Sequence, residues 1–226
     1  MPMISLPKFC VSMTTVLMLT AACEQELYEK GDSSMSYMRA DFVEAFVGSG
    51  KQVDYVITDD GDSLQLTAPY KGSWIERPDT FYRALMYYNQ RGTTAEISSM
   101  YRVPVLSAKR DVIGLNKAKT DPVGLETIWM SRSKRYLNLG LLLKTGEAEA
   151  EKPRAQSFGI VKDGTALNDD RTLTLNLTLS HNQGDIPQYY TQRSYLSIAV
   201  SELKVDSLRL TLHTYDGVVS RVFSLR

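Results

Sequence analysis

The chain has little cysteine and little histidine, with two residues of each among 226. Cys10 lies in a segment that we expect to be removed, so the sequence predicts neither a disulfide nor a thiolate metal site in the mature protein. The chain also has no charge excess, since 26 Lys and Arg face 26 Asp and Glu. This balance gives no basis for a nucleic-acid partner. We expect no metal and no cofactor.

The first 22 residues have the features of an export signal. Lys8 supplies the positive charge, and residues 9–19 form an apolar run that is too short to span a bilayer comfortably. The run ends in Leu-Thr-Ala-Ala before Cys23, which resembles the lipobox of bacterial lipoproteins. A thioether-linked lipid requires a thiol, and the peptidase requires small residues before the cut. The sequence therefore predicts a signal peptide over 1–22 and lipidation of Cys23, which would anchor the chain in a membrane.

Residues 23–37 are polar and poor in apolar side chains, as is typical of a flexible tether. Glu24 and Glu26 follow the cysteine directly and resemble the surface-export signal of Bacteroidetes lipoproteins. We expect an outer-membrane lipoprotein of the cell envelope, with surface exposure as one possibility.

Residues 38–110 read as short strands separated by turns, with an irregular stretch around Trp74. Alternating apolar side chains, such as those of Val53, Tyr55 and Ile57, indicate strands. Five strands with a break after the third suit a small OB-like barrel. The expected strands cover 40–47, 52–58, 63–68, 81–89 and 95–106.

Residues 111–124 contain lysines, proline and glycine and are predicted to link the barrel to a second domain over 125–226. Leucines at every second position of 137–143 and 173–179 indicate half-buried strands. Asp216-Gly217 favours a tight hairpin. About seven strands within 100 residues suggest an immunoglobulin-like β-sandwich. The fold class is therefore all-β, with the barrel followed by the sandwich.

The lipobox, the five-stranded first half, Trp129, Tyr136-Leu137-Asn138 and the Ser-His-Asn run before Gly184 together resemble the NigD-like lipoproteins of Bacteroides and relatives. The resemblance implies an N-terminal OB-like domain and a C-terminal β-sandwich. It also implies that Trp129, Tyr136 and Asn138 are a structural motif, which we interpret as sandwich core and a strand-to-turn tie. The family name comes from an operon linked to bacteriocin production, which implies an immunity or envelope-protection role as a hypothesis.

The sequence offers few candidates for catalysis. Ser131 and Lys134 have the Ser-x-x-Lys spacing, but they precede a strand and not the helix that this chemistry needs. The aspartates around Gly61 are better explained by a turn than by a cation site. His181 and His213 have no nucleophile and carboxylate that can be named beside them, so we interpret both as structural. We therefore predict no catalytic residue.

Aromatic residues are the better candidates for binding. OB folds bind oligosaccharides or oligonucleotides by stacking on strands two and three and on the adjoining loops. Tyr55 and Trp74 are the candidate binding residues there, against the alternative that they fill a core or an interface.

Three hypotheses for function follow. The first is a non-enzymatic envelope lipoprotein that binds a glycan or a protein. The second is a bacteriocin immunity or envelope-protection protein. The third, a glycan-processing enzyme, requires two carboxylates about 5–10 Å apart in a cleft.

Overall fold

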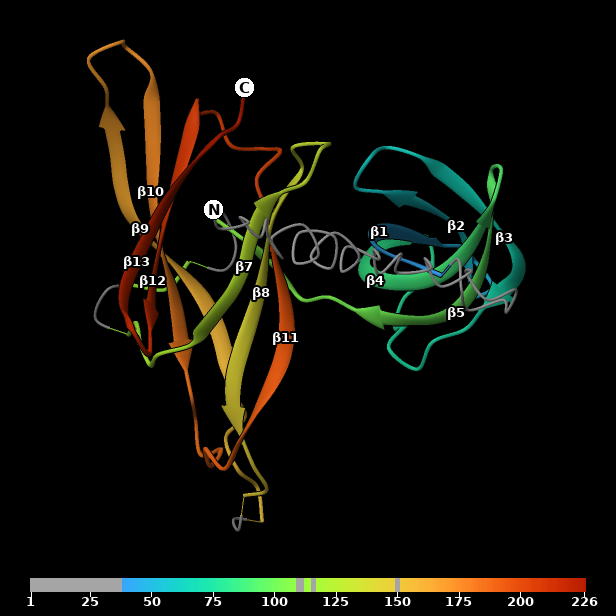
Figure 1. The fold of residues 1–226 in the computed structure, drawn as a ribbon, viewed down its shortest axis with the longest axis horizontal. Coiled ribbons are helices and arrows are strands. Elements are labelled where there is room, and N and C mark those ends of the chain that lie inside the picture. The colour runs from blue at the N-terminus through green and yellow to red at the C-terminus, as the bar shows by residue number, and fades with distance from the viewer. Residues whose placement is uncertain (1–37, 109–111, 115–116, 149–150) are drawn as a thin grey trace, which may run out of the picture. The chain divides into compact units, whose positions relative to one another are not determined.

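A computed structural model describes residues 38–226 with the exception of 109–111, 115–116 and 149–150. The predicted signal peptide, Cys23 and the predicted tether lie outside the described residues. The described part of the chain is all-β, as predicted, and it contains no helix long and apolar enough to cross a bilayer. Its strands form one closed barrel and two four-stranded sheets (Figure 1).

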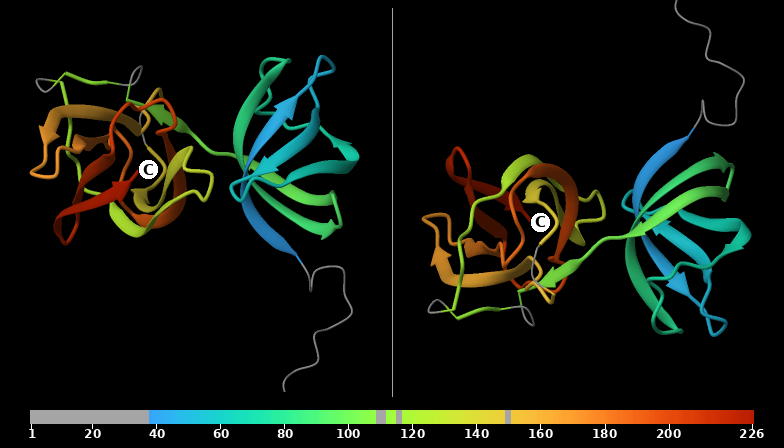
Figure 2. Two further views of the ribbon diagram at one scale, coloured as in Figure 1. Left: turned by 90° about the horizontal axis from the view of Figure 1, so that it is seen from above. Right: turned by 90° about the horizontal axis from the view of Figure 1, so that it is seen from below.

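The first five strands close into a barrel in the order β1-β2-β3-β5-β4, with β4 returning to β1 (Figure 2). β3 and β5 pair in parallel, and the other pairs are antiparallel. Apolar side chains from every strand fill the interior, including Val43, Met86 and Tyr88. The predicted OB-like barrel is confirmed. The strands are β1 (Arg39–Val47), β2 (Val53–Thr58), β3 (Ser63–Tyr70), β4 (Thr80–Arg91) and β5 (Thr94–Arg102).

The remaining strands form a β-sandwich, which is also confirmed. One sheet has the order β13-β12-β10-β9 and the other the order β6-β11-β8-β7. The alternating leucines of β8, β10 and β12 form its core; Leu137, Leu139 and Leu141, for example, are fully buried. The strands are β6 (Val105–Ser107), β7 (Gly124–Met130), β8 (Tyr136–Thr145), β9 (Ser157–Leu167), β10 (Leu173–Asn182), β11 (Tyr190–Ala199), β12 (Ser207–Thr214) and β13 (Gly217–Ser224).

The expected single strand over 95–106 is wrong, because the chain divides it between two sheets. β5 ends at Arg102, and β6 pairs with β11 of the sandwich from Val105 onward. Pro104 lies between them, and its missing N–H cannot continue the barrel ladder. The chain therefore leaves the barrel after Arg102, before residue 110, where the sequence predicted that the barrel domain ends.

Described parts of the predicted linker, 111–124, lie along the sandwich sheet that contains β9, β10 and β12. Its described residues form single bridges to that sheet, from Val112 to Ile160, from Thr120 to His181 and from Val123 to Thr214.

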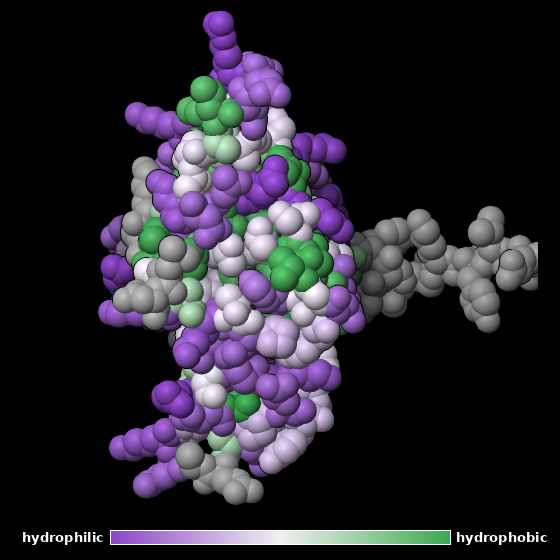
Figure 3. Space-filling model, turned by 90° about the vertical axis from the view of Figure 1, so that its left-hand side faces the viewer, coloured by the Kyte–Doolittle hydropathy of each residue, from purple (hydrophilic) through white to green (hydrophobic). Residues whose placement is uncertain are grey.

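The side of the sandwich that bears β9 and β13 is mixed in polarity, with separate apolar patches among hydrophilic residues (Figure 3). Leu167, Val218 and Val222 are the large exposed apolar side chains of those two strands.

Candidate functional site

Three residue pairs of β1 and β4 lie on the outward face of the barrel. The pairing register places Phe42 opposite Leu85, Glu44 opposite Arg83, and Phe46 opposite Phe81. Residues between them, such as Val43 and Ala84, point into the barrel core. Because side chains alternate along a strand, the three pairs follow one another on a single surface.

The first pair is apolar and contacts the sandwich. The ring of Phe42 meets the rings of Trp129 and Tyr195 edge to face, with centroid distances of 5.3 and 5.4 Å. Leu85 and Val103 are buried beside it, and Trp129 and Tyr195 are partly buried against this cluster. Aromatic pairs of this geometry contribute about 0.5–1.5 kcal/mol each beyond the burial of their area.

The second pair is charged and buried. Arg83 is 4% exposed and donates two hydrogen bonds to the carboxylate of Asp59, at 2.7 and 2.6 Å. Its guanidinium also donates to Asn138 Oδ1 at 3.1 Å and lies 4.2 Å from the ring centroid of Tyr136. Ser197 donates to the same Asn138 oxygen at 2.8 Å, and Asn138 Nδ2 donates to Asp59 at 3.0 Å. The barrel and the sandwich thus share one polar network in which each buried charge has several partners.

Glu44, the partner of Arg83 in this second pair, binds the start of β8. It accepts a hydrogen bond from the Tyr136 hydroxyl at 2.7 Å and pairs with Arg135. Burial, with a smaller effect of the bond to Glu44, raises the pKa of Tyr136 to about 12. The hydroxyl therefore stays protonated and donates to the carboxylate at physiological pH.

The structure brings Trp129, Tyr136 and Asn138 together, but not in the core of the sandwich as we interpreted them. All three lie on the outer face of their sheet and contact the barrel, through Phe42, Glu44 and Asp59 respectively. Asn138 is fully buried because the barrel covers it. The motif is a junction between the two halves of the fold.

The third pair forms an aromatic cluster that we define as Phe46, Tyr55 and Phe81. Phe46 lies opposite Tyr55 on β2 and opposite Phe81 on β4. Its ring centroid is 5.1 Å from each of theirs, with interplanar angles of 25° and 58°. Phe81 is 47% exposed, and the other two rings are half-buried. Three touching rings at a protein surface are typical of an interaction site.

The two predicted binding residues, Tyr55 and Trp74, lie in different environments. Tyr55 belongs to the aromatic cluster on the outer surface. Trp74 packs against the barrel core, with its ring 5.5 Å from that of Tyr82 and its indole N–H donating to the carbonyl of Met100 at 3.4 Å. Trp74 therefore fills the end of the barrel, which is the structural alternative considered from the sequence.

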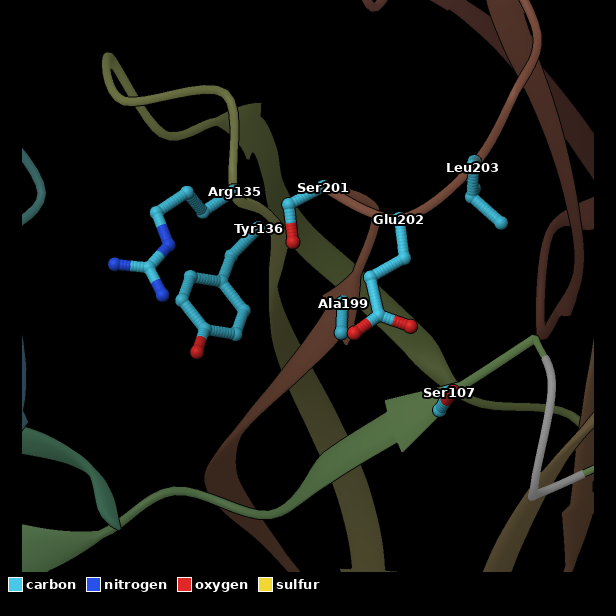
Figure 4. A pocket seen from close by; sticks show the side chains of 7 residues that line it. All are labelled: Ser107, Arg135, Tyr136, Ala199, Ser201, Glu202 and Leu203. Carbon is cyan, nitrogen blue, oxygen red and sulfur yellow. The ribbon is translucent and has the colours of Figure 1, made fainter. Parts of the chain in front are cut away.

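A pocket of about 390 Å³ opens where β6, β8 and β11 meet (Figure 4). Tyr136 at the start of β8 and Arg135 just before it line the pocket on one side. Ser201 and Glu202 line it from the segment after β11. These polar groups surround a space large enough for a small ligand. Since Arg135 and Tyr136 also bind Glu44, the pocket adjoins the outward face of the barrel two residues along β1 from the aromatic cluster.

A second pocket, of about 380 Å³, contains three carboxylates, those of Asp41, Asp59 and Asp60. Asp41 accepts a bond from Tyr88 at 2.7 Å, Asp59 binds Arg83, and Asp60 pairs with Arg132 at 3.4 Å. Each of the three carboxylates thus has a partner within the chain. Within the described ranges, no group of three or more His, Cys, Asp and Glu side chains could hold a metal ion.

His181 is structural, as we interpreted it. Its ring is stacked on Phe158 at 4.9 Å, and its nitrogens lie 3.0 Å from the carbonyl of Asp121 and 3.2 Å from the side-chain oxygen of Gln156. Burial, opposed by the bond to Asp121, lowers its pKa below the ordinary 6.5. The neutral ring thus holds the linker against the sandwich.

No protein-family model matches the sequence. The comparison with curated proteins also finds no match.

Several solved structures share the fold. A NigD-like immunity protein from Bacteroides caccae has a TM-score of 0.59 and 24% sequence identity, over 82% of this chain and 96% of that chain. A protein described as toxin-related from Parabacteroides distasonis has a TM-score of 0.60 and 20% identity, over 82% and 92% of the two chains. One described as a lipoprotein, from Bacteroides fragilis, has a TM-score of 0.53 and 12% identity, over 84% and 98%.

These similarities show the fold of the described chain, the barrel joined to the sandwich. One of these structures is named as a NigD-like protein, the family that the sequence resembles.

Proposed function

We propose that this chain is a non-enzymatic lipoprotein of the bacterial outer membrane, anchored through Cys23, that binds a protein partner with the aromatic cluster. The observation that carries the proposal is the exposure of Phe81 beside Phe46 and Tyr55 on a closed barrel. Aromatic side chains held on rigid strands lose little conformational entropy on binding, which is why they dominate protein interfaces.

The geometry of the cluster favours a protein over a glycan. A sugar ring stacks best on the open face of a flat aromatic platform. Here Phe46 and Tyr55 stack on each other, and Phe81 meets Tyr55 at 82° with a centroid distance of 6.2 Å. The three rings form a compact apolar cluster, which suits contact with apolar side chains of a partner protein.

The anchor is tested by fractionation and protease shaving of intact cells of the native host. We expect the wild-type chain in the membrane fraction and its domains cleaved from the outside, and the Cys23→Ala variant released from the membrane. Full protection of the membrane-bound chain would place the domains in the periplasm and contradict the outward orientation.

The binding surface is tested by placing a photoreactive benzophenone amino acid at position 81 in cells of the native host. We expect a discrete protein adduct on irradiation. The matched control carries the same group at position 167, where Leu167 is 71% exposed on β9. Adducts of equal mass and yield at both positions, or none at position 81, would contradict the proposal.

A second candidate is an immunity role against a bacteriocin, which the fold similarity to the NigD-like immunity protein favours. In that case the protein partner is the toxin or its receptor. A deletion strain challenged with bacteriocin-containing supernatants of related strains should become sensitive, and the wild-type gene should restore resistance where Cys23→Ala does not. Unchanged resistance of the deletion strain would refute this role.

A further inference from the structure

The strand β11 has an edge that the described residues leave largely uncovered. β11 pairs with β8 along its full length, from Tyr190 to Ala199. On its other side, β6 pairs only with Ser197–Ala199. The preceding six residues, Thr191–Leu196, span about 20 Å at ~3.3 Å per residue. We call this stretch the free edge.

The direction of the main-chain groups on the free edge follows from one hydrogen bond. The N–H of Ser197 donates to the carbonyl of Pro104 at 3.0 Å, so the N–H and C=O groups of Ser197 point away from β8. Successive residues of a strand point their N–H and C=O groups to opposite sides, and the pairing of β11 with β8 has no register shift that would break this alternation. Tyr195 and Arg193 therefore direct their N–H and C=O groups to the side of β6, where no described strand pairs with them.

A cleft of about 460 Å³ lies along the same edge. Leu143, Leu196 and Phe158 line it from the sandwich, and Tyr87 and Tyr101 line it from the barrel. The two tyrosine rings meet edge to face at 6.2 Å, and Tyr101 is 59% exposed. The cleft thus has an apolar floor beside main-chain groups that can accept a strand.

The charged groups at the cleft are already neutralised. Arg193 donates to Glu126 at 2.6 Å, and Arg102 donates to Glu76 at 2.9 Å. The cleft therefore has no strong preference for an anionic or a cationic ligand.

We propose that the free edge of β11 binds an extended peptide segment of a partner protein as an added strand, with an apolar side chain in the cleft. Unpaired main-chain groups repeating every second residue are complemented by the main chain of another strand, and the adjacent cavity provides specificity for alternate side chains. The neutral lining points to an uncharged, strand-forming sequence. This site is separate from the aromatic cluster, so the two proposals can fail independently.

The test uses the full-length chain, purified in detergent, and a phage-displayed library of random 12-residue peptides. Selected peptides are measured against the wild-type chain, Arg193→Ala and Arg193→Pro. Proline removes the N–H of residue 193, which faces the free edge, and leaves the bonds to β8 intact. Alanine removes the same side chain but keeps that N–H. We expect about a tenfold loss of affinity with Arg193→Pro relative to Arg193→Ala.

Two further measurements keep the test independent of any misfolding of the proline variant. Tyr101→Ala, which removes an exposed ring of the cleft, should also weaken binding. In the wild-type chain, peptide binding should slow hydrogen exchange at the amides of Arg193 and Tyr195 and leave that of Ser194 unchanged. A library without binders, or binders that tolerate all the variants and do not protect these amides, would overturn the proposal.

Discussion

Replacement of Arg83 by alanine should destabilise the protein more than the loss of any exposed charge. The side chain of Arg83 is 1% exposed, and it holds Asp59 and Asn138 in one network across the junction. Without it, the bond from Asn138 Nδ2 is the one side-chain bond that the described residues still make to the carboxylate of Asp59, whose side chain is 18% exposed. The variant therefore leaves a largely buried charge without its counter-ion.

The size of the expected loss of stability follows from the cost of breaking a buried ion pair. Removing one partner of such a pair typically costs about 3–5 kcal/mol, because the remaining charge is desolvated and uncompensated. For a domain of about 150–250 residues, each kcal/mol lowers Tm by about 2–4 °C. We expect Arg83→Ala to lower Tm by about 6–20 °C.

Differential scanning calorimetry provides the measurement, and Arg102→Ala is the matched control. Arg102 also pairs with a carboxylate, that of Glu76, but the two side chains are 45% and 64% exposed. An exposed pair contributes about 1 kcal/mol or less. A double-mutant cycle with Asp59→Ala should show a coupling of about 0.5–3 kcal/mol. Equal shifts of Tm for Arg83→Ala and Arg102→Ala, or a coupling near zero, would refute the reasoning.

Three further predictions concern pH and packing. The pKa of Tyr136 is raised to about 12, so its contribution to the stability of the folded state is lost as pH rises from the ordinary 10.0 toward 12. Burial also raises the pKa of Tyr88, which adds a loss of the same sign, so Tyr136→Phe should reduce the fall of stability in urea titrations at pH 9–12. Burial lowers the pKa of His181, so stability should fall as pH drops below the ordinary 6.5, and His181→Gln should flatten the profile of Tm between about pH 7 and 5. Leu139→Ala, at a fully buried position, should cost about 2–5 kcal/mol in urea unfolding, whereas Leu167→Ala, at a 71% exposed position, should stay within about 0.5 kcal/mol.

The strands of the sandwich could be predicted where apolar and polar residues alternate strictly along the sequence. Leu137, Leu139 and Leu141 are all fully buried, because one face of β8 lies against the opposite sheet. β9 was missed, since its buried residues Ile160 and Val161 are consecutive and no period of two is visible. The pairing of β9 with β10 shifts by one residue next to Gly164, which has a φ of +131° and lies opposite Asn176. Beyond this shift, the residues of β9 that face the core occupy the other set of alternate positions. Such a bulge adds a residue that no alternation rule anticipates.

The junction was missed for a different reason. An arginine in a strand is normally taken as solvent-exposed, and so Arg83 was not considered. One pattern could have revealed it: Tyr82, Ala84 and Met86 are apolar on one face of β4, and Phe81 and Leu85 are apolar on the other. A strand with apolar residues on both faces is covered on both over part of its length, so a charged residue in that part requires a buried counter-ion. The sequence could not show which carboxylate supplies it, because Asp59 approaches Arg83 only when the barrel closes.

The order of the three outward pairs connects the buried charge network to the proposed binding surface. Along β1 and β4 the sandwich covers the Phe42 pair and the Glu44 pair and leaves the Phe46 pair exposed. Each pair lies two residues, or about 7 Å, from the next on the same strands, so strand geometry fixes the distance from the junction to the aromatic cluster. An apolar contact alone would tolerate sliding of the two halves. The hydrogen bonds that Asn138 makes with Arg83 and Asp59 cross the junction and accept one geometry. The network therefore sets where the cluster lies relative to the sandwich. Variants that break it should weaken partner crosslinking from the photoreactive group at position 81, although Phe46 and Tyr55 are unchanged.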